Sequence, residues 1–160
     1  MASGSYLSGI YAQKIYANKG SMIGSIGVIM QGFDISNLAQ KIGFSEQVVK
    51  AGEFKEAGTI MRKWSQKERE SLQNLVDKSY EFFVSEVANA RKLDQNKSDE
   101  WANARVFFAD DAAKIGLIDK VGNYKTAKIE VEKLSGVAVP IWQEPTPYEK
   151  MLDRLGAKGE

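Results

Sequence analysis

The sequence predicts an α/β fold with a mostly parallel sheet and flanking helices. Segments with strand-like composition alternate with segments of helical periodicity, and residues 26–30 form a continuous apolar run of strand length. A run that is apolar on both faces is typical of a central strand in a covered sheet. A chain of 160 residues can bury one sizeable core, so one domain is expected.

The first third of the chain alternates short helices and strands. Helices are expected where apolar residues recur at helical spacing and a capping residue or glycine marks an end. Strands are expected where short apolar runs lie between turns. The predicted elements are a helix at residues 4–13, strands at 14–17, 26–30 and 47–51, and a helix capped by Asp34 or Ser36 that stops at Gly43.

The clearest helix follows residue 65. Ser65 and Glu68 have the spacing of a capping box, in which each side chain binds the other residue's backbone N–H group. Behind them an apolar stripe runs at helical spacing through Leu72, Val76 and Phe83 to Ala90. The charged residues of this helix mostly face away from the stripe, which indicates a solvated face rather than a binding patch.

The rest of the chain completes the alternation. We expect a short helix from Ser98, a strand at 105–108, a helix at 109–116, an amphipathic helix around 127–134, and an edge strand at 137–142. The domain is therefore expected to span residues 1–142. Residues 143–160 are expected to form a polar tail or docking arm with a short helix near 148–155.

Composition excludes several kinds of site. The 22 basic and 21 acidic residues leave a net charge of +1, which gives no electrostatic reason to expect nucleic acid or an anionic membrane surface as a partner. The absence of cysteine excludes disulfides and thiolate chemistry, and the absence of histidine excludes a Ser-His-Asp triad within this chain. Any transition-metal site would have to rely on carboxylates, and no metal or cofactor is expected.

Ser3 is the candidate nucleophile. It lies on a small-residue turn that opens a helix, and Gly4 follows it. Small residues in such a turn allow backbone N–H groups to point at a developing oxyanion. The alternative is that the Ser-Gly pair is only a helix cap.

A serine without histidine can be activated by a neutral lysine. Free lysine has a pKa of ~10.4, so a base that works near pH 7 to 8 needs a downward shift of roughly three units. Lys55 is the candidate, because Phe54 and nearby small residues could desolvate its amine. Glu53 and Glu56 oppose this assignment unless they point away from Lys55.

Six segments of the chain resemble, in order and spacing, motifs of the signal peptide peptidase A family of Ser/Lys peptidases. Together they cover roughly residues 1–125, the C-terminal half of that family's catalytic domain. They lie at residues 1–6, 14–20, 23–29, 50–56, 104–107 and 112–119. The resemblance implies a ClpP/crotonase-like fold. Because Ser3 lies so near the start, we expect the N-terminal half of the domain to be missing from this chain.

The resemblance also assigns roles by position. Ser3 matches the nucleophile, Lys55 the general base, and Ser25 a serine that hydrogen-bonds the lysine and orients its amine. The N–H of Gly4 would be one oxyanion donor, and the second would come from a glycine-rich loop upstream of residue 1. The family usually has glycine where this chain has Ser5.

Family properties complete the expectation. The resemblance implies a serine endopeptidase that hydrolyses apolar peptides such as cleaved signal-peptide remnants. It also implies a homo-oligomer on the extracytoplasmic side of the bacterial inner membrane, with a membrane anchor outside this chain. The missing half of the protein would be a further partner.

Three alternatives remain. The chain could be a non-catalytic fragment or assembly module that is inactive without the missing half. It could instead be a crotonase-like acyl-CoA enzyme, which would not require Lys55. Ser5 or Ser8 could replace Ser3 as the nucleophile, although neither matches the family position.

Overall fold

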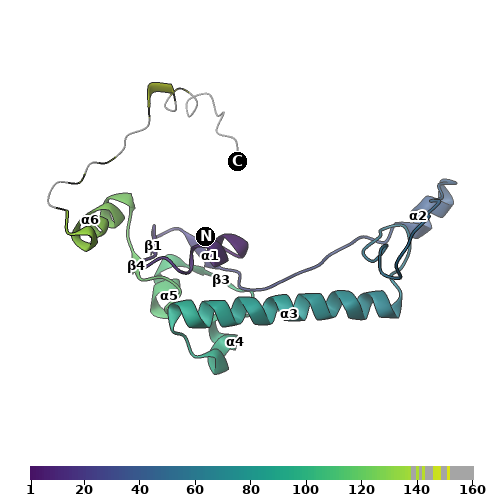
Figure 1. Ribbon diagram of the computed structural model, residues 1–160, viewed down its shortest axis with the longest axis horizontal. Coiled ribbons are helices and arrows are strands. Elements are labelled where there is room, and N and C mark those ends of the chain that lie inside the picture. Colours follow the sequence, from purple (N-terminus) through teal and green to yellow (C-terminus); the bar gives the residue numbers. More distant parts are fainter. Residues whose placement is uncertain (138–139, 141, 143–145, 149–150, 152–160) are drawn as a thin grey trace. The chain divides into compact units, whose positions relative to one another are not determined.

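The computed structural model describes residues 1–137, 140, 142, 146–148 and 151. The chain divides into two compact units, Met1–Gly122 and Asn123–Glu160. Helices and strands alternate through the first unit, which confirms the α/β class (Figure 1). Its elements are α1 (Gly4–Gly9), β1 (Tyr16–Ala17), β2 (Met22–Gly24), α2 (Ser36–Lys41), α3 (Gln66–Arg91), η1 (Gln95–Lys97), α4 (Ser98–Trp101), β3 (Val106–Phe108), α5 (Ala109–Lys114) and β4 (Lys120–Val121).

The described strands form two pairs. β1 and β4 are parallel, with Tyr16 opposite Lys120. β2 and β3 are antiparallel, with Ile23 opposite Phe107. Ala2 adds a parallel bridge to Gly24 at the end of β2. The predicted parallel pairing is therefore present, but the described residues do not form one mostly parallel sheet.

One core cluster joins the ends of the first unit. Its largest fully buried side chains come from α1, from the segments after β2 and α5, and from the C-terminal half of α3. The Tyr6 hydroxyl donates a 2.6 Å hydrogen bond to the carbonyl of Leu117. Burial raises the pKa of Tyr6 well above its ordinary value, so this hydroxyl remains a donor. This bond ties α1 to the end of α5, and α1 is the helix that follows Ser3.

The predicted long helix is confirmed. α3 runs for 26 residues, and both hydrogen bonds of the Ser65–Glu68 capping box are present. Lys92 ends it in the left-handed conformation, and its N–H donates to the carbonyl of Ala88. The predicted apolar stripe is buried only in the C-terminal half: Phe83 is 4% exposed, whereas Leu75 is 55% exposed.

Two predicted strands are wrong. Residues 26–30 form no strand, although the carbonyl of Ile26 accepts a hydrogen bond from Ala104 at 3.0 Å. Residues 27–30 make no further backbone hydrogen bonds to the segment at Ala104, and the side chain of Ile29 is 81% exposed. Residues 47–51 also form no strand, and the side chain of Val49 is fully exposed. A strand requires a neighbour for its N–H and C=O groups, and beyond the Ile26 carbonyl the described residues supply none at these positions.

The second unit contains α6 (Tyr124–Ser135), which confirms the predicted amphipathic helix. The Asn123 side chain caps its start by accepting from the N–H of Thr126. Trp142 donates from Nε1 to Glu132 at 2.9 Å, and Lys128 Nζ lies 4.5 Å from the centroid of its ring. The predicted strand at 137–142, the helix near 148–155 and the tail 143–160 fall mostly outside the described residues. The predicted boundary after residue 142 stays a prediction.

None of the helices described here is both long and apolar enough to cross a lipid bilayer.

Candidate active site

Ser3 lies in a strained turn between a sheet bridge and a helix. Its N–H donates to the carbonyl of Gly24 at 2.8 Å, beside the Ala2–Gly24 bridge. Its carbonyl accepts from the N–H groups of Tyr6 and Leu7 in α1. With φ 53° and ψ −130°, Ser3 has a backbone conformation that a residue with a Cβ rarely adopts. The bridge on one side and the helix on the other hold it there.

The nearby serine hydroxyls differ in their partners. The Ser5 hydroxyl accepts from the N–H of Ala2 at 2.9 Å and donates to the carbonyl of Ala2 at 2.7 Å. The Ser8 hydroxyl donates to the carbonyl of Ser5. Among the described residues, the exposed Ser3 hydroxyl has no such partner. Ser3 is therefore the serine of this turn whose hydroxyl is open to an external group.

Gly4 is the first residue of α1. The first N–H groups of a helix have no partner within the helix, so the Gly4 N–H is available to an outside acceptor. A Cβ added to Gly4 would meet no atom within 4 Å. The space in front of Gly4 is therefore open in this chain.

Ser25 lies directly beside the Ser3 turn. It follows Gly24, the residue whose carbonyl receives the Ser3 N–H. Ser25 has φ 51°, and its N–H donates to the carbonyl of Arg105 at 2.8 Å. Gly24 has φ 104°, and a Cβ there would lie 2.8 Å from the same carbonyl oxygen. The backbone at the end of β2 is therefore tightly constrained, and it brings Ser25 close to Ser3.

A mainly apolar cavity of about 360 Å³ opens at Ser3. Its walls come from the Ser3 turn, from the unpaired segment after Ser25 and from the middle of α3. The lining residues are Ser3, Gly4, Leu7, Gly27, Val28, Ile29, Ser79, Phe82 and Phe83. Apolar side chains beside an available hydroxyl favour an apolar ligand.

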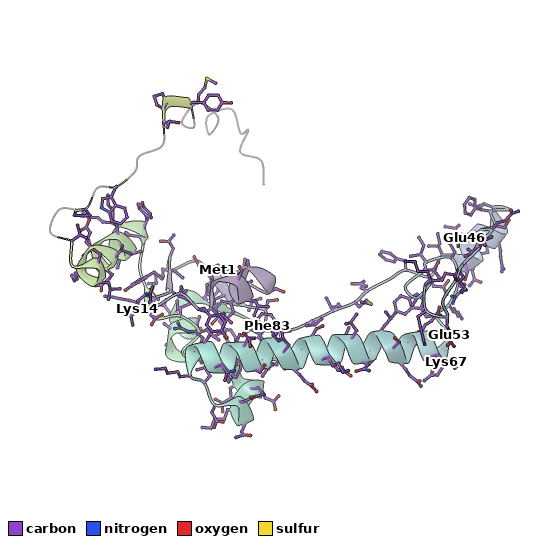
Figure 2. The ribbon with its side chains drawn as sticks, viewed as in Figure 1. Met1, Lys14, Glu46, Glu53, Lys67 and Phe83 are labelled. Atoms are coloured by element: carbon purple, nitrogen blue, oxygen red, sulfur yellow. The ribbon has the colours of Figure 1, made fainter. Side chains whose placement is uncertain are left out.

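Lys55 lies far from this cavity within one chain. It is an exposed residue of the turn at 52–58, where the neighbouring Glu53 accepts from Lys67 at 2.9 Å. Lys67 is in the first turn of α3, whereas the cavity at Ser3 is lined by Ser79. The helix between Lys67 and Ser79 rises by about 18 Å. Figure 2 shows Glu53 and Lys67 at one end of α3, with Phe83 and Met1 toward the other.

The structure therefore brings Ser3, Gly4 and Ser25 together but leaves Lys55 of the same chain apart. The predicted roles of these four residues stay predictions. The described residues include no group of three or more carboxylates that could hold a metal ion.

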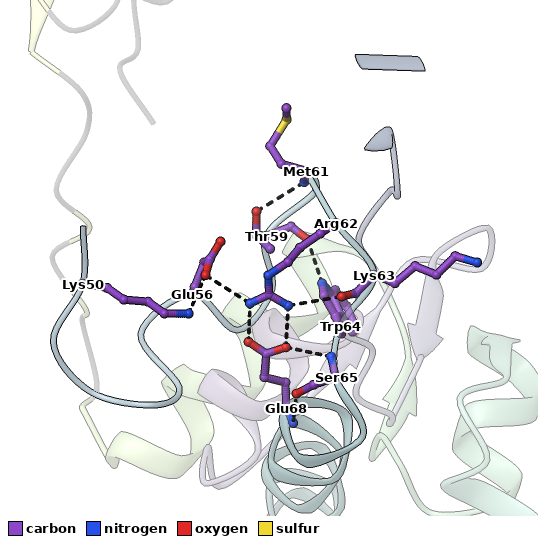
Figure 3. A network of polar contacts seen from close by, with 9 residues as sticks. All are labelled: Lys50, Glu56, Thr59, Met61, Arg62, Lys63, Trp64, Ser65 and Glu68. Atoms are coloured by element: carbon purple, nitrogen blue, oxygen red, sulfur yellow. Dashed lines mark hydrogen bonds and ion pairs between the residues drawn. The ribbon is translucent and has the colours of Figure 1, made fainter. Parts of the chain in front are cut away.

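An ionic network that the sequence did not predict joins Lys50 and Glu56 to Arg62 and Glu68 at the start of α3 (Figure 3). Arg62 donates to both oxygens of Glu68, from Nη2 to Oε1 at 2.7 Å and from Nη1 to Oε2 at 2.8 Å. Arg62 Nη2 also donates to Glu56 at 3.1 Å, and Lys50 donates to the same Glu56 oxygen at 2.6 Å. The sequence contained the opposite charges, but no regular spacing links partners across an irregular loop.

The network has a clear electrostatic effect. The Arg62 fork, with help from the N–H of Ser65, lowers the pKa of Glu68 to about 2. Hydrogen bonds from Lys50 and then from Arg62 lower the pKa of Glu56. The two carboxylates in turn raise the pKa of Arg62. All three groups are therefore charged at neutral pH.

Comparison with known proteins identifies the family. The family model described as "Peptidase family S49" matches residues 1–138. A protein of Methanocaldococcus jannaschii, named provisionally as a protease, is 36% identical over 139 residues, which are 87% of this chain and 45% of that protein. The "Serine protease SPPA, chloroplastic" of Arabidopsis thaliana is 33% identical over 127 residues, 79% of this chain and 19% of that protein. "Protease 4" of Salmonella typhi is 27% identical over 158 residues, 96% of this chain and 25% of that protein.

The chain belongs to peptidase family S49, and the predicted relationship to signal peptide peptidase A proteins is confirmed. It spans about half the length of the first curated relatives it matches, 45% of one and 56% of another.

Proposed function

We propose that this protein is a serine endopeptidase that hydrolyses apolar peptides, with Ser3 as nucleophile and Lys55 as general base. The observation that carries the proposal is the strained Ser3 turn, whose unengaged hydroxyl opens into an apolar cavity. The similarity to proteins named as proteases supports the class of reaction.

The base is assigned to Lys55 of a second copy of the chain. About 18 Å of helix separates the Lys55 turn from the Ser3 cavity within one chain, which is too far for proton transfer. The segment that carries Lys55 exposes large apolar side chains, which favours contact with another molecule. These are Phe33, Leu38, Ile42, Phe44, Val49 and Phe54. A homo-oligomer would supply such a contact.

The proposed reaction is acyl transfer. The neutral Lys55 amine removes the proton from the Ser3 hydroxyl as Oγ attacks the peptide carbonyl carbon. The N–H of Gly4 stabilises the resulting oxyanion, with a second donor from outside this chain. The Lys55 ammonium then protonates the leaving amine. Water, deprotonated by Lys55, hydrolyses the Ser3 ester and restores both residues.

Ser25 is proposed to accept or donate a hydrogen bond to the incoming Lys55 amine and to fix its direction. Its position beside the Ser3 turn supports this role. We further propose a ClpP/crotonase-like fold for the complete domain and an extracytoplasmic location in a bacterial membrane-anchored assembly.

The test is hydrolysis of an apolar fluorogenic peptide by the protein and three alanine variants. Ser3→Ala and Lys55→Ala should each lower kcat/KM by about 10³-fold or more, because each removes a reacting group. Ser8→Ala is the matched control and should stay within about twofold, because that hydroxyl binds only the helix backbone. Full activity of Ser3→Ala would exclude Ser3 as the nucleophile, and full activity of Lys55→Ala would exclude the dyad. No hydrolysis by the unaltered protein would favour the assembly-module alternative.

A further inference from the structure

The two carboxylates that flank Lys55 in sequence are both bound to other cations. Glu53 Oε1 lies 2.9 Å from Lys67 Nζ, and Glu56 Oε2 lies 2.6 Å from Lys50 Nζ and 3.1 Å from Arg62 Nη2. A carboxylate within ion-pair distance of Lys55 would stabilise its ammonium form and oppose its use as a base. The pairing of Glu53 and Glu56 with other cations removes that obstacle.

The Glu56 partners form the stronger of the two arrangements. The Glu53–Lys67 pair is mostly exposed, with side chains 60% and 73% accessible. Exposed ion pairs contribute little to the free energy of folding. The Glu56 side chain is only 17% accessible and receives two cationic donors. Glu56 is therefore the flanking carboxylate whose placement the structure controls.

Arg62 is fixed independently of Lys55. Its fork binds both oxygens of Glu68, which is 4% exposed and also accepts from the N–H of Ser65 at 2.8 Å. This places Arg62 at the start of α3 with Nη2 directed at Glu56, as Figure 3 shows. A planar guanidinium can hold two carboxylates in this way, which a single ammonium group does less precisely.

The three carboxylates of the Lys55 turn and the start of α3 are paired without Lys55. The loop supplies Lys50, Glu53 and Glu56, and the segment into α3 supplies Arg62, Lys67 and Glu68, with each carboxylate bound to at least one of these cations. Two further cations lie nearby: Lys63 acts electrostatically on Asp34, and Arg69 lies over the ring of Trp64. In the part of the chain that is described, Lys55 itself has no carboxylate partner.

We propose that Arg62 is a positioning residue for Lys55: with Lys50, it holds the Glu56 carboxylate away from the Lys55 amine and so keeps that amine available as a base. The inference rests on the proposed function, in which Lys55 takes the proton from Ser3. Arg62 acts through Glu56 and contacts neither the substrate nor the reacting atoms.

The direct test is the titration midpoint of the Lys55 side chain, measured by NMR on protein with ¹³C-labelled lysine and assigned with Lys55→Arg. Arg62→Gln should raise this midpoint by up to about half a pH unit, because Glu56 then keeps only Lys50 as a partner and can approach the Lys55 ammonium. Arg62→Gln/Glu56→Gln should return the midpoint to the wild-type value. Both variants share the damage at Glu68, so the difference between them isolates the Glu56 carboxylate.

Two further variants keep the test valid if the loss of Arg62 unfolds the loop. Lys50→Gln removes the other Glu56 partner, which makes the shorter contact, without touching the Arg62–Glu68 fork, and it should shift the midpoint upward by a similar amount. Lys114→Gln is the control, because it frees the exposed Asp111 carboxylate in α5 instead, and it should leave the midpoint unchanged. An unchanged midpoint in both Arg62→Gln and Lys50→Gln would overturn the proposal, as would failure of the double variant to restore it.

The pH–rate profile separates this inference from the proposed function. If Lys55 is the base, the acidic limb of kcat/KM in Arg62→Gln should move to higher pH by the same interval as the NMR midpoint, and activity should recover at high pH. A purely structural role for Arg62 would lower activity equally at every pH and would contradict the proposal. Normal hydrolysis by Lys55→Ala would reject the proposed function, while the NMR midpoint would still decide whether Arg62 controls Glu56.

Discussion

The two halves of α3 are held by different forces. The C-terminal half buries Phe83, Val84, Val87 and Ala88 in the core that supports the Ser3 turn. The N-terminal half leaves Leu75 exposed and is tied to the Lys55 turn by the Arg62 and Lys67 ion pairs. A densely packed apolar core is destabilised by small changes in side-chain volume, whereas ion pairs fix the orientation of the side chains they join. The turn of the proposed nucleophile, Ser3, is therefore supported by a packed apolar core. The turn of the proposed general base, Lys55, is held by ion pairs.

The largest expected effect on stability comes from the packed half. Phe83→Ala should lower the free energy of unfolding by ~3–5 kcal/mol, because it empties a site that is 4% exposed. Leu75→Ala, its counterpart in the other half, should cost less than ~1 kcal/mol. Urea unfolding at a concentration that keeps the chain monomeric measures both. Equal losses would contradict the division of α3 into two regions.

Asp119 tests a polar contact inside the packed region. Although burial opposes its ionisation, hydrogen bonds from the Ile15 N–H, Lys14 and Arg91 lower the pKa of Asp119 below its ordinary value of 3.8. Asp119→Asn should cost ~1–3 kcal/mol at pH 7, because it weakens these bonds.

The pH dependence of that cost follows from the sign of the shift. A carboxyl with a lowered pKa contributes stability above its unfolded pKa and loses it as the pH falls through the folded pKa. The difference between wild type and Asp119→Asn should therefore be complete above about pH 5 and shrink below about pH 4. A difference that stays constant from pH 7 to pH 3 would show that the charge of Asp119 is unimportant.

A smaller effect is expected at the start of α3. Ser65→Ala removes the hydroxyl that accepts from the Glu68 N–H and should cost ~1 kcal/mol. Hydrogen exchange should accelerate about fivefold for the Arg69 amide, which donates to the Ser65 carbonyl, and stay unchanged around Val87. Uniform acceleration along α3 would mean that the helix opens as one unit.

Local signals predicted most of the helices. The Ser65–Glu68 spacing located the start of α3, and Gly43, with φ 72°, lies just beyond the end of α2 as predicted. The apolar run at 26–30 misled the strand prediction, because composition reports a preference for burial but not whether a partner strand is present. Only Ile26 of that run is fully buried here.

The site was predicted in part. Small residues around Ser3 and Ser25 indicated two constrained turns, and both serines have positive φ. The spatial separation of Lys55 from Ser3 could not be predicted from the sequence. It arises because the Lys55 turn packs at the N-terminal end of α3, whereas the Ser3 cavity lies at the middle of that helix. Nor could the Arg62 network be predicted, because Arg62 and its partner Glu56 lie on an irregular segment that has no repeating spacing, while its other partner, Glu68, lies in α3.

The most direct test of the central proposal is a mixture of two inactive variants. Ser3→Ala and Lys55→Ala should each be inactive alone on the apolar peptide. If the base comes from a second copy, co-assembly in equal amounts pairs an intact Ser3 with an intact Lys55 in about a quarter of the sites. About one quarter of wild-type activity should therefore return after co-assembly. No recovery in confirmed mixed assemblies would contradict it and would place both residues of the dyad in one chain.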